Sequence, residues 1–181
     1  GTPSQLESLG TSVFEGCTSL SSINLPSNGL LKVIPEKAFY NCYSLTALTI
    51  PEGIETISNM SLSGALVTEL TIPASVTTLG TYGGNYTSTP SFSNGINASY
   101  QANGTYLSNL TTLTILGDIE NIGYGALAYN KNLTTVILSD KLTHLGVGMF
   151  AYCDALKTVK VLKENGTVVG EDGKAILPSA L

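Results

Sequence analysis

The chain has 181 residues, of which 43% are hydrophobic and only 12% are charged, so it is long enough for one domain with a substantial buried core. Its formal net charge is −5 and it contains no arginine, which argues against nucleic acid as a partner, because such surfaces cluster Lys and Arg on one face. No apolar run approaches the length of a membrane-spanning helix, so we expect no membrane span in this chain.

The predicted elements belong to a repeating unit, best seen in residues 34–51 (IPEKAFYNCYSLTALTIP). Its first half spaces apolar residues three and four apart, as one or two helical turns would. Its second half alternates as a short strand, and Pro51 ends that strand because proline has no N–H to give to a ladder. The third copy is one residue short, and the fourth is interrupted and resumes at Leu110. Copies begin at Leu9, Ile34, Ile57, Leu79, Ile122 and Leu145.

Apart from the interrupted copy, these starts lie 22 to 25 residues apart, a period typical of a solenoid whose repeats stack to bury a shared core. The sequence therefore predicts an α/β repeat solenoid of about six repeats, with short strands on one face and short helical or irregular segments on the other. Equivalent residues should form ladders along the axis. One ladder would hold Phe14, Phe39, Leu62, Leu127 and Phe150, and another Leu25, Ile50, Ile72, Ile115, Leu138 and Val161.

The pattern L-x-x-I-x-L-P followed by x-x-I-G-x-x-A-F-x-x-C-x-x-L resembles the leucine-rich repeats of the BspA-like bacterial surface proteins. It is carried by residues 20–26, 34–45, 45–51, 119–133 and 142–156, and it covers roughly residues 6–162. The resemblance implies a leucine-rich-repeat right-handed superhelix and an extracellular or cell-surface location. The sequence departs from the pattern at Leu116, Ser139 and Leu162, where proline is expected, and at an insertion in the fourth repeat.

The first candidate binding surface is the outward side of the predicted strands. The residues that flank the inward ones make a flat, threonine-rich and nearly uncharged array. Threonine also simply suits an exposed strand, so the composition alone does not require binding. The array comprises Ser22, Asn24, Ala47, Thr49, Glu69, Thr71, Thr112, Thr114, Thr135, Ile137, Thr158 and Lys160.

The second candidate is the insertion 81–106, which holds four of the nine tyrosines and lies in a stretch without charged residues between Glu69 and Asp118. Tyr, Ser, Gly and Asn together are the composition of a recognition loop. Its aromatic residues could stack on a sugar or a peptide, or could instead pack back against the repeats. They are Tyr82, Tyr86, Phe92, Tyr100 and Tyr106.

Catalytic and metal-binding chemistry finds little support. The single histidine, His144, cannot be joined to a serine and an acid by spacing, and the thirteen carboxylates are scattered, mostly in predicted turns. Cys17, Cys42 and Cys153 share one repeat position, where we expect a buried thiol that acts as a small apolar residue. A disulfide between the first two is geometrically conceivable, and a metal site is not indicated. We expect no cofactor.

We therefore interpret residues 1–162 as the repeat domain and residues 163–181 as either a C-terminal hairpin cap or the start of a further module. The hairpin would join Val168-Val169 to residues 175–177 through a turn at Glu171-Asp172-Gly173. The resemblance implies a non-catalytic adhesion function, in which the strand face, the insertion or both bind host or neighbouring-cell proteins. The alternatives are a carbohydrate-binding module that uses the insertion for glycans, and a structural spacer in a longer surface protein.

Overall fold

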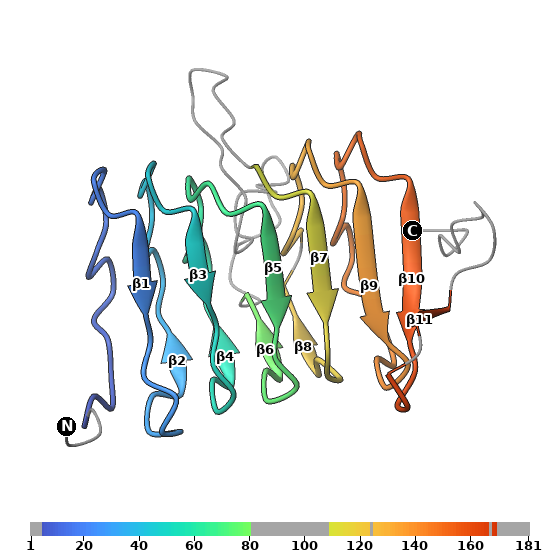
Figure 1. Ribbon diagram of the computed structural model, residues 1–181, viewed down its shortest axis with the longest axis horizontal. Coiled ribbons are helices and arrows are strands. Elements are labelled where there is room, and N and C mark those ends of the chain that lie inside the picture. Colours follow the sequence, from blue (N-terminus) through green and yellow to red (C-terminus); the bar gives the residue numbers. More distant parts are fainter. Residues whose placement is uncertain (1–4, 81–108, 124, 167, 170–181) are drawn as a thin grey trace, which may run out of the picture.

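The computed structural model describes residues 5–80, 109–123, 125–166 and 168–169. Within these residues the chain forms a parallel β-solenoid of about five turns (Figure 1). All regular structure in the described part is β-strand, so the predicted α/β class is wrong in its helical half. The described residues contain no helix that is long and apolar enough to span a membrane.

Six strands lie side by side in chain order and form the front of the solenoid (Figure 1). They are β1 (Ser22–Asn24), β3 (Ala47–Thr49), β5 (Glu69–Ile72), β7 (Thr112–Ile115), β9 (Thr135–Ser139) and β10 (Thr158–Leu162). A second sheet of two-residue strands follows them. It consists of β2 (Val33–Ile34), β4 (Thr56–Ile57), β6 (Thr78–Leu79) and β8 (Asn121–Ile122), paired in that order. All these pairs are parallel, because each strand returns to the same sense after one full repeat.

The alternation in each strand decides which side chains enter the core. In β5, Leu70 and Ile72 are buried while Glu69 and Thr71 are exposed, and β7 alternates in the same way between half-buried and buried residues. The register confirms the second predicted ladder from Ile72 through Ile115 and Leu138 to Val161. For the first predicted ladder, Phe14 stacks on Phe39. The central members of both ladders are fully buried, whereas terminal members such as Phe14 are only partly covered.

The third side of the solenoid consists of turns where the sequence suggested helix. In the five repeats whose turns the structure describes, two residues have a positive φ of 55° to 90°. The first such position holds Ser12, Lys37, Met60, Gly125 and Gly148, and the second holds Gly16, Asn41, Gly64, Tyr129 and Tyr152. A left-handed residue breaks the run of right-handed conformations that a helix needs. The backbone therefore bonds to the next repeat, as from Phe39 N to Ser61 O at 2.8 Å.

The front ladder is interrupted between β3 and β5. The front strands divide into a two-stranded sheet, β1–β3, and a five-stranded sheet that runs from β5 through β7, β9 and β10 to β11 (Val168–Val169). This break coincides with the third repeat, which is one residue short, and the described link nearby is the bond from Leu66 N to Leu45 O at 2.8 Å. The second sheet continues across the same junction through β2, β4 and β6.

The last strand of the ladder has an antiparallel neighbour. β11 pairs with β10 through Val161–Val169 and Leu162–Val168, so a hairpin covers the outer edge of β10. The hairpin predicted from sequence paired β11 with residues 175–177, which lie outside the described residues. The described partner of β11 is the final repeat itself.

Candidate binding surface

Four front strands present their outward side chains in two aligned rows. Because β5, β7, β9 and β10 pair in register without a slip, Glu69, Thr112, Thr135 and Thr158 form one row. Thr71, Thr114, Ile137 and Lys160 form the other row. We call these eight residues the threonine face. Neighbouring members of a row are about 4.8 Å apart, the spacing of paired strands.

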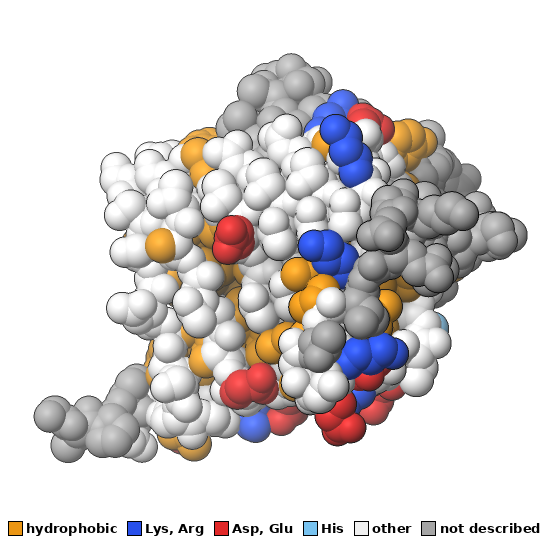
Figure 2. Space-filling view, turned by 45° about the vertical axis from the view of Figure 1, so that its right-hand side comes forward, with side chains coloured by type: hydrophobic (Ala, Val, Ile, Leu, Met, Phe, Trp, Pro, Cys, Tyr) orange, Lys and Arg blue, Asp and Glu red, His pale blue; other side chains and the backbone are white. Residues whose placement is uncertain are grey.

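Charge is nearly absent from the threonine face. Its one acid, Glu69, lies on β5, and its one base, Lys160, lies on β10, so the two charges occupy opposite edges and opposite rows. Figure 2 shows few charged side chains over the middle of this side, while acidic and basic side chains gather along the lower edge. The face is therefore suited to a neutral partner surface rather than to a strongly charged one.

A second set of threonines hydrogen-bonds one repeat to the next. Thr111 precedes β7, and its hydroxyl donates to Thr68 O at 3.0 Å, while Thr134 precedes β9 and donates to Thr111 O at 3.1 Å. Each hydroxyl shares its acceptor with the backbone N–H groups of the same repeat. These threonines stabilise the stacking of repeats, whereas the threonines on the threonine face have no such bond among the described contacts.

The other residues predicted for binding lie apart from the threonine face. Asn24 pairs with Thr49 on β1 and β3, where both are exposed, but the interrupted ladder separates this pair from β5. The five aromatic residues of the insertion lie outside the described residues. The structure thus brings the strand residues of β5 to β10 together in one array and leaves Asn24 and Thr49 as a smaller neighbouring patch.

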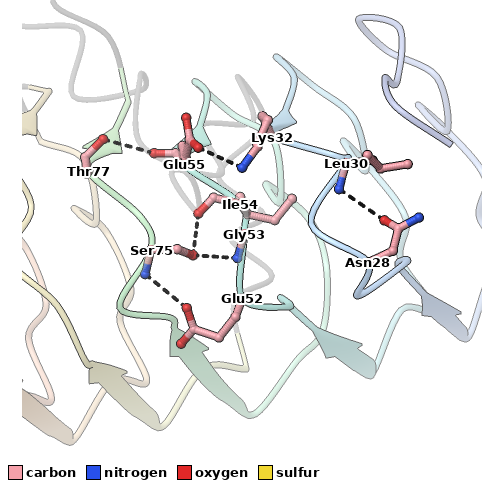
Figure 3. Close-up of polar contacts among 9 residues, drawn as sticks. All are labelled: Asn28, Leu30, Lys32, Glu52, Gly53, Ile54, Glu55, Ser75 and Thr77. Carbon is pink, nitrogen blue, oxygen red and sulfur yellow. Dashed lines mark hydrogen bonds and ion pairs between the residues drawn. The ribbon is translucent and has the colours of Figure 1, made fainter. Parts of the chain in front are cut away.

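The corners that follow the front strands hold carboxylates whose role sequence reasoning missed. Glu52 accepts a hydrogen bond from Ser75 N, one repeat further on, at 3.1 Å (Figure 3). It also accepts one from Ala74 N at 3.1 Å. The Ser75 hydroxyl accepts from Gly53 N at 2.9 Å and donates to Ile54 O at 2.7 Å (Figure 3). The acid three residues after the end of β3 was the available signal, but its partner lies a full repeat away.

Carboxylates nearer the C-terminus also accept hydrogen bonds from backbone N–H groups of the next repeat. Asp118 accepts from Thr143 N at 3.0 Å, and Asp140 accepts from Glu164 N at 3.4 Å. Two ion pairs add to these corners, Lys32–Glu55 at 2.9 Å (Figure 3) and Lys141–Glu164 at 3.3 Å, with side chains at least half exposed. Exposed pairs of this kind contribute about 0–1 kcal/mol each. The charged side chains at these corners therefore bond to the neighbouring repeat and stabilise the stacking.

His144 does not form a catalytic relay. The Thr143 hydroxyl lies between the two other groups, 3.1 Å from Asp118 Oδ1 and 3.3 Å from His144 Nδ1, and both contacts are exposed. A serine-protease-like relay needs the imidazole between the acid and the hydroxyl. A hollow of about 540 Å³ beside His144 is lined by Leu138, Leu142 and Val161, among others. In the described part of the chain no three His, Cys, Asp or Glu side chains gather to hold a metal ion.

The three cysteines are free thiols. Cys42 and Cys153 are buried as expected, but each thiol also donates to a carbonyl of the preceding repeat, Phe14 O at 3.1 Å and Leu127 O at 3.4 Å. Burial raises the pKa of both thiols, that of Cys153 to about 11. Cys17 is exposed, contrary to the expectation of a buried thiol, because no described repeat precedes it.

An aromatic pair on the turn side was also missed. Tyr129 and Tyr152 occupy the same position in successive repeats, and their rings stack with centroids 4.7 Å apart and an interplanar angle of 19°. Tyr152 remains 52% exposed. The signal in the sequence was the tyrosine seven residues after the start of both the fifth and the sixth copies.

Stacked parallel strands that recur once per repeat define a leucine-rich-repeat solenoid, a class typically made of non-catalytic interaction or surface modules. The family model "BspA type Leucine rich repeat region (6 copies)" matches residues 2–93 and 90–172. The chain therefore belongs to the BspA-type leucine-rich repeat family.

Two solved structures share the fold. The Treponema pallidum leucine-rich repeat protein TpLRR is 22% identical, with a TM-score of 0.62 over 87% of this chain and 64% of that one. A leucine-rich repeat protein from Bacteroides ovatus is 27% identical, with a TM-score of 0.56 over 86% of this chain and 34% of that one. The chain thus spans only part of the length of either protein. No curated protein sequence matches it.

Proposed function

We propose that this chain is a non-catalytic, protein-binding module of a secreted or cell-surface bacterial protein, and that the threonine face contacts the partner. Host or neighbouring-cell proteins are the partners that the family relationship favours. The observation that carries the proposal is the exact-register array of β5, β7, β9 and β10, which holds eight outward side chains in two rows with one charge at each edge.

The physical chemistry of the face supports binding without a large entropic cost. Thr and Ile are β-branched, so few rotamers are available to them before contact, and ordering them on binding costs little. Their backbone is already held by a ladder on both sides in β7 and β9. Hydroxyls and methyl groups at a regular spacing suit a partner that offers hydrogen-bonding and apolar groups together.

The size of the face limits the affinity. The four strands of the threonine face, at about 4.8 Å spacing, are roughly 20 Å across, and strands of four or five residues are about 15 Å long. The resulting area, roughly 300 Å², is less than half of what one partner contributes to a standard stable interface. We therefore expect weak binding at a single copy, strengthened where several copies are displayed on one surface.

The same experiment also tests two other functions. Carbohydrate binding through the insertion 81–106 is supported by its tyrosine-rich composition alone, and its residues lie outside those described. A spacer role in a longer protein is compatible with any of the repeats. Each alternative predicts a different response to substitutions on the front strands.

The test uses matched substitutions on the two sheets. Thr114→Arg places a charge in the middle of the threonine face, while Thr56→Arg places the same charge on β4 of the second sheet, at an equally half-buried, outward position. Both proteins are applied to a panel of purified extracellular matrix proteins and to a glycan array. We expect Thr114→Arg to weaken binding to a matrix protein at least about tenfold, or 1.4 kcal/mol, and Thr56→Arg to leave it unchanged.

The other outcomes are equally informative. Equal binding by the two variants would refute the threonine face as the contact. Binding to glycans alone, unaffected by Thr114→Arg, would favour the carbohydrate alternative. No binding to either panel would favour the spacer.

A further inference from the structure

Cys17 and Cys42 face each other across the first two repeats. Residues 25 positions apart are opposite in this part of the solenoid, since Phe14 stacks on Phe39 with centroids 5.5 Å apart and rings 10° from parallel. The backbone agrees, because Phe14 N donates to Ala38 O at 2.9 Å. Neighbouring strands or turns in such a ladder are about 4.8 Å apart, within the Cα separation that disulfides adopt.

A shared carbonyl fixes how close the two residues are. Phe14 O accepts from Cys17 N at 3.1 Å and from the Cys42 thiol at 3.1 Å. The Cys42 sulfur therefore cannot be farther from the Cys17 nitrogen than these two distances combined. Cys17 is exposed, so its side chain is free to take the staggered rotamer that a bond to Cys42 needs.

The two thiols differ in access. Cys17 is exposed and open to a reagent in solution, whereas Cys42 is buried and hydrogen-bonded. Burial also raises the pKa of the Cys42 thiol, which makes it a poor first nucleophile. Cys17 is therefore the residue that meets an oxidant first, and Cys42 is the residue placed to resolve the product.

We propose that Cys17 and Cys42 form an inter-repeat disulfide on reaction with a small-molecule disulfide such as oxidised glutathione. The Cys17 thiolate attacks one sulfur of the reagent, and the reagent's S–S bond breaks to release one glutathione thiolate. Cys42 then gives its proton to solvent, and its sulfur displaces the second glutathione from Cys17. Two protein thiols become one disulfide while one oxidised glutathione becomes two reduced ones. This inference does not depend on the proposed binding function.

Cys153 provides an internal control. Its thiol is buried and donates to Leu127 O of the preceding repeat, as Cys42 donates to Phe14 O. The residue opposite Cys153 is Asn130, however, whose side chain donates to the same carbonyl at 2.6 Å. Cys153 thus has the environment of Cys42 without a facing thiol, and it should stay reduced under conditions that join the other two.

The bridge would hold the least covered part of the molecule. In the first repeat Val13 is 42% exposed and Phe14 is only partly buried. A link from Cys17 to Cys42 closes a loop as long as one repeat, which restricts the unfolded chain and ties the first repeat to the second. We expect the melting temperature to rise by several degrees and amide exchange around residues 12–17 to slow.

The experiment equilibrates the full chain with mixtures of reduced and oxidised glutathione, blocks free thiols with an alkylating reagent, and maps the peptides by mass spectrometry. We expect a loss of about 2 Da, a peptide that joins Cys17 to Cys42, and alkylated Cys153. The variant Cys42→Ser, whose hydroxyl can still donate to Phe14 O, should instead keep one glutathione on Cys17. Cys17→Ser should stay unmodified.

Several outcomes would overturn the proposal. These are three alkylated cysteines in the oxidising mixtures, a lasting glutathione adduct on Cys17 while Cys42 is intact, a bridge that includes Cys153, or a Cys17–Cys17 link between two molecules. Circular dichroism of each variant establishes that it is folded, so that a missing bridge is not the result of unfolding.

Discussion

Four glycines allow two effects on stability to be measured separately: a positive φ, and the close approach of backbone from a neighbouring repeat. Gly10 has no positive φ and no atom within 4 Å of an added Cβ, whereas Gly16 has a φ of +71° and equally open space. At Gly117, which lacks a positive φ, an added Cβ would lie 2.6 Å from Ala74 O. Gly53 combines both, with a φ of +100° and a Cβ position 2.9 Å from Gly29 Cα.

Replacement of each by alanine should give four different changes in the free energy of unfolding. Alanine at an unstrained site stabilises by about 0.4–1 kcal/mol because it restricts the unfolded chain, so Gly10→Ala should be neutral or stabilising. A left-handed alanine costs about 1–2 kcal/mol, so Gly16→Ala should be modestly destabilising. The Gly117 contact is with backbone that the ladder holds in place, which predicts a loss of about 1–3 kcal/mol. Gly53→Ala should lose about 2–4 kcal/mol.

Urea unfolding followed by circular dichroism measures these differences, provided that the slope m is the same for all five proteins. Gly10→Ala is the control, since it makes the same chemical change without either cost. If Gly117→Ala unfolded at the same urea concentration as Gly10→Ala, the close approach of successive corners would be wrong. If Gly53→Ala were no less stable than Gly16→Ala, contact would contribute nothing at that corner.

Three further changes test single contacts. Ser61→Ala should raise the free energy of unfolding by about 1 kcal/mol in urea, because the Ser61 hydroxyl is buried with no hydrogen-bond partner in the described part. Alanine already occupies this repeat position at Ala38 and Ala126. A loss of stability would show that the hydroxyl is hydrogen-bonded. Glu52→Ala should cost about 1 kcal/mol through two lost bonds, and Glu52→Gln less; equal losses would contradict this reading. Burial raises the pKa of Cys153 from 9.0 to about 11, so the folded state keeps a proton that the unfolded chain releases. Stability should therefore fall as pH rises from 9 toward 11, by up to about 2–3 kcal/mol, and less so in Cys153→Ala; identical pH profiles would refute the linkage.

The solenoid could be predicted because its signal is redundant. Side chains such as Ile50, Ile72 and Ile115 recur at one position and alternate with polar residues, so period and strand agree with each other. The outward array followed directly, since alternation determines which residues of each strand face solvent. The interruption of the front ladder also had a signal, the missing residue in the third repeat, but its effect on pairing depends on how the whole chain stacks.

The helical segments were wrong for a specific reason. Ala38, Phe39 and Cys42 have helical spacing, yet two left-handed residues per repeat produce the same inward pattern with a different backbone. Glycine at Gly16 and Gly64 was the visible clue, and non-glycine residues such as Lys37 concealed it. The corner carboxylates could not be assigned at all, because a bond such as that from Ser75 N to Glu52 is visible only once the repeat height is known.

The antiparallel strand β11 determines how copies of this protein can associate. A parallel ladder has two unlike edges, and two copies joined end to end through those edges would form a fibre without closure. At β10 the outer edge is already paired with a neighbour of the opposite sense and only two residues in length. Another molecule would have to displace β11 before it could extend the ladder. Within the described residues, the five-stranded sheet thus ends in a short antiparallel strand that hinders end-to-end association of copies.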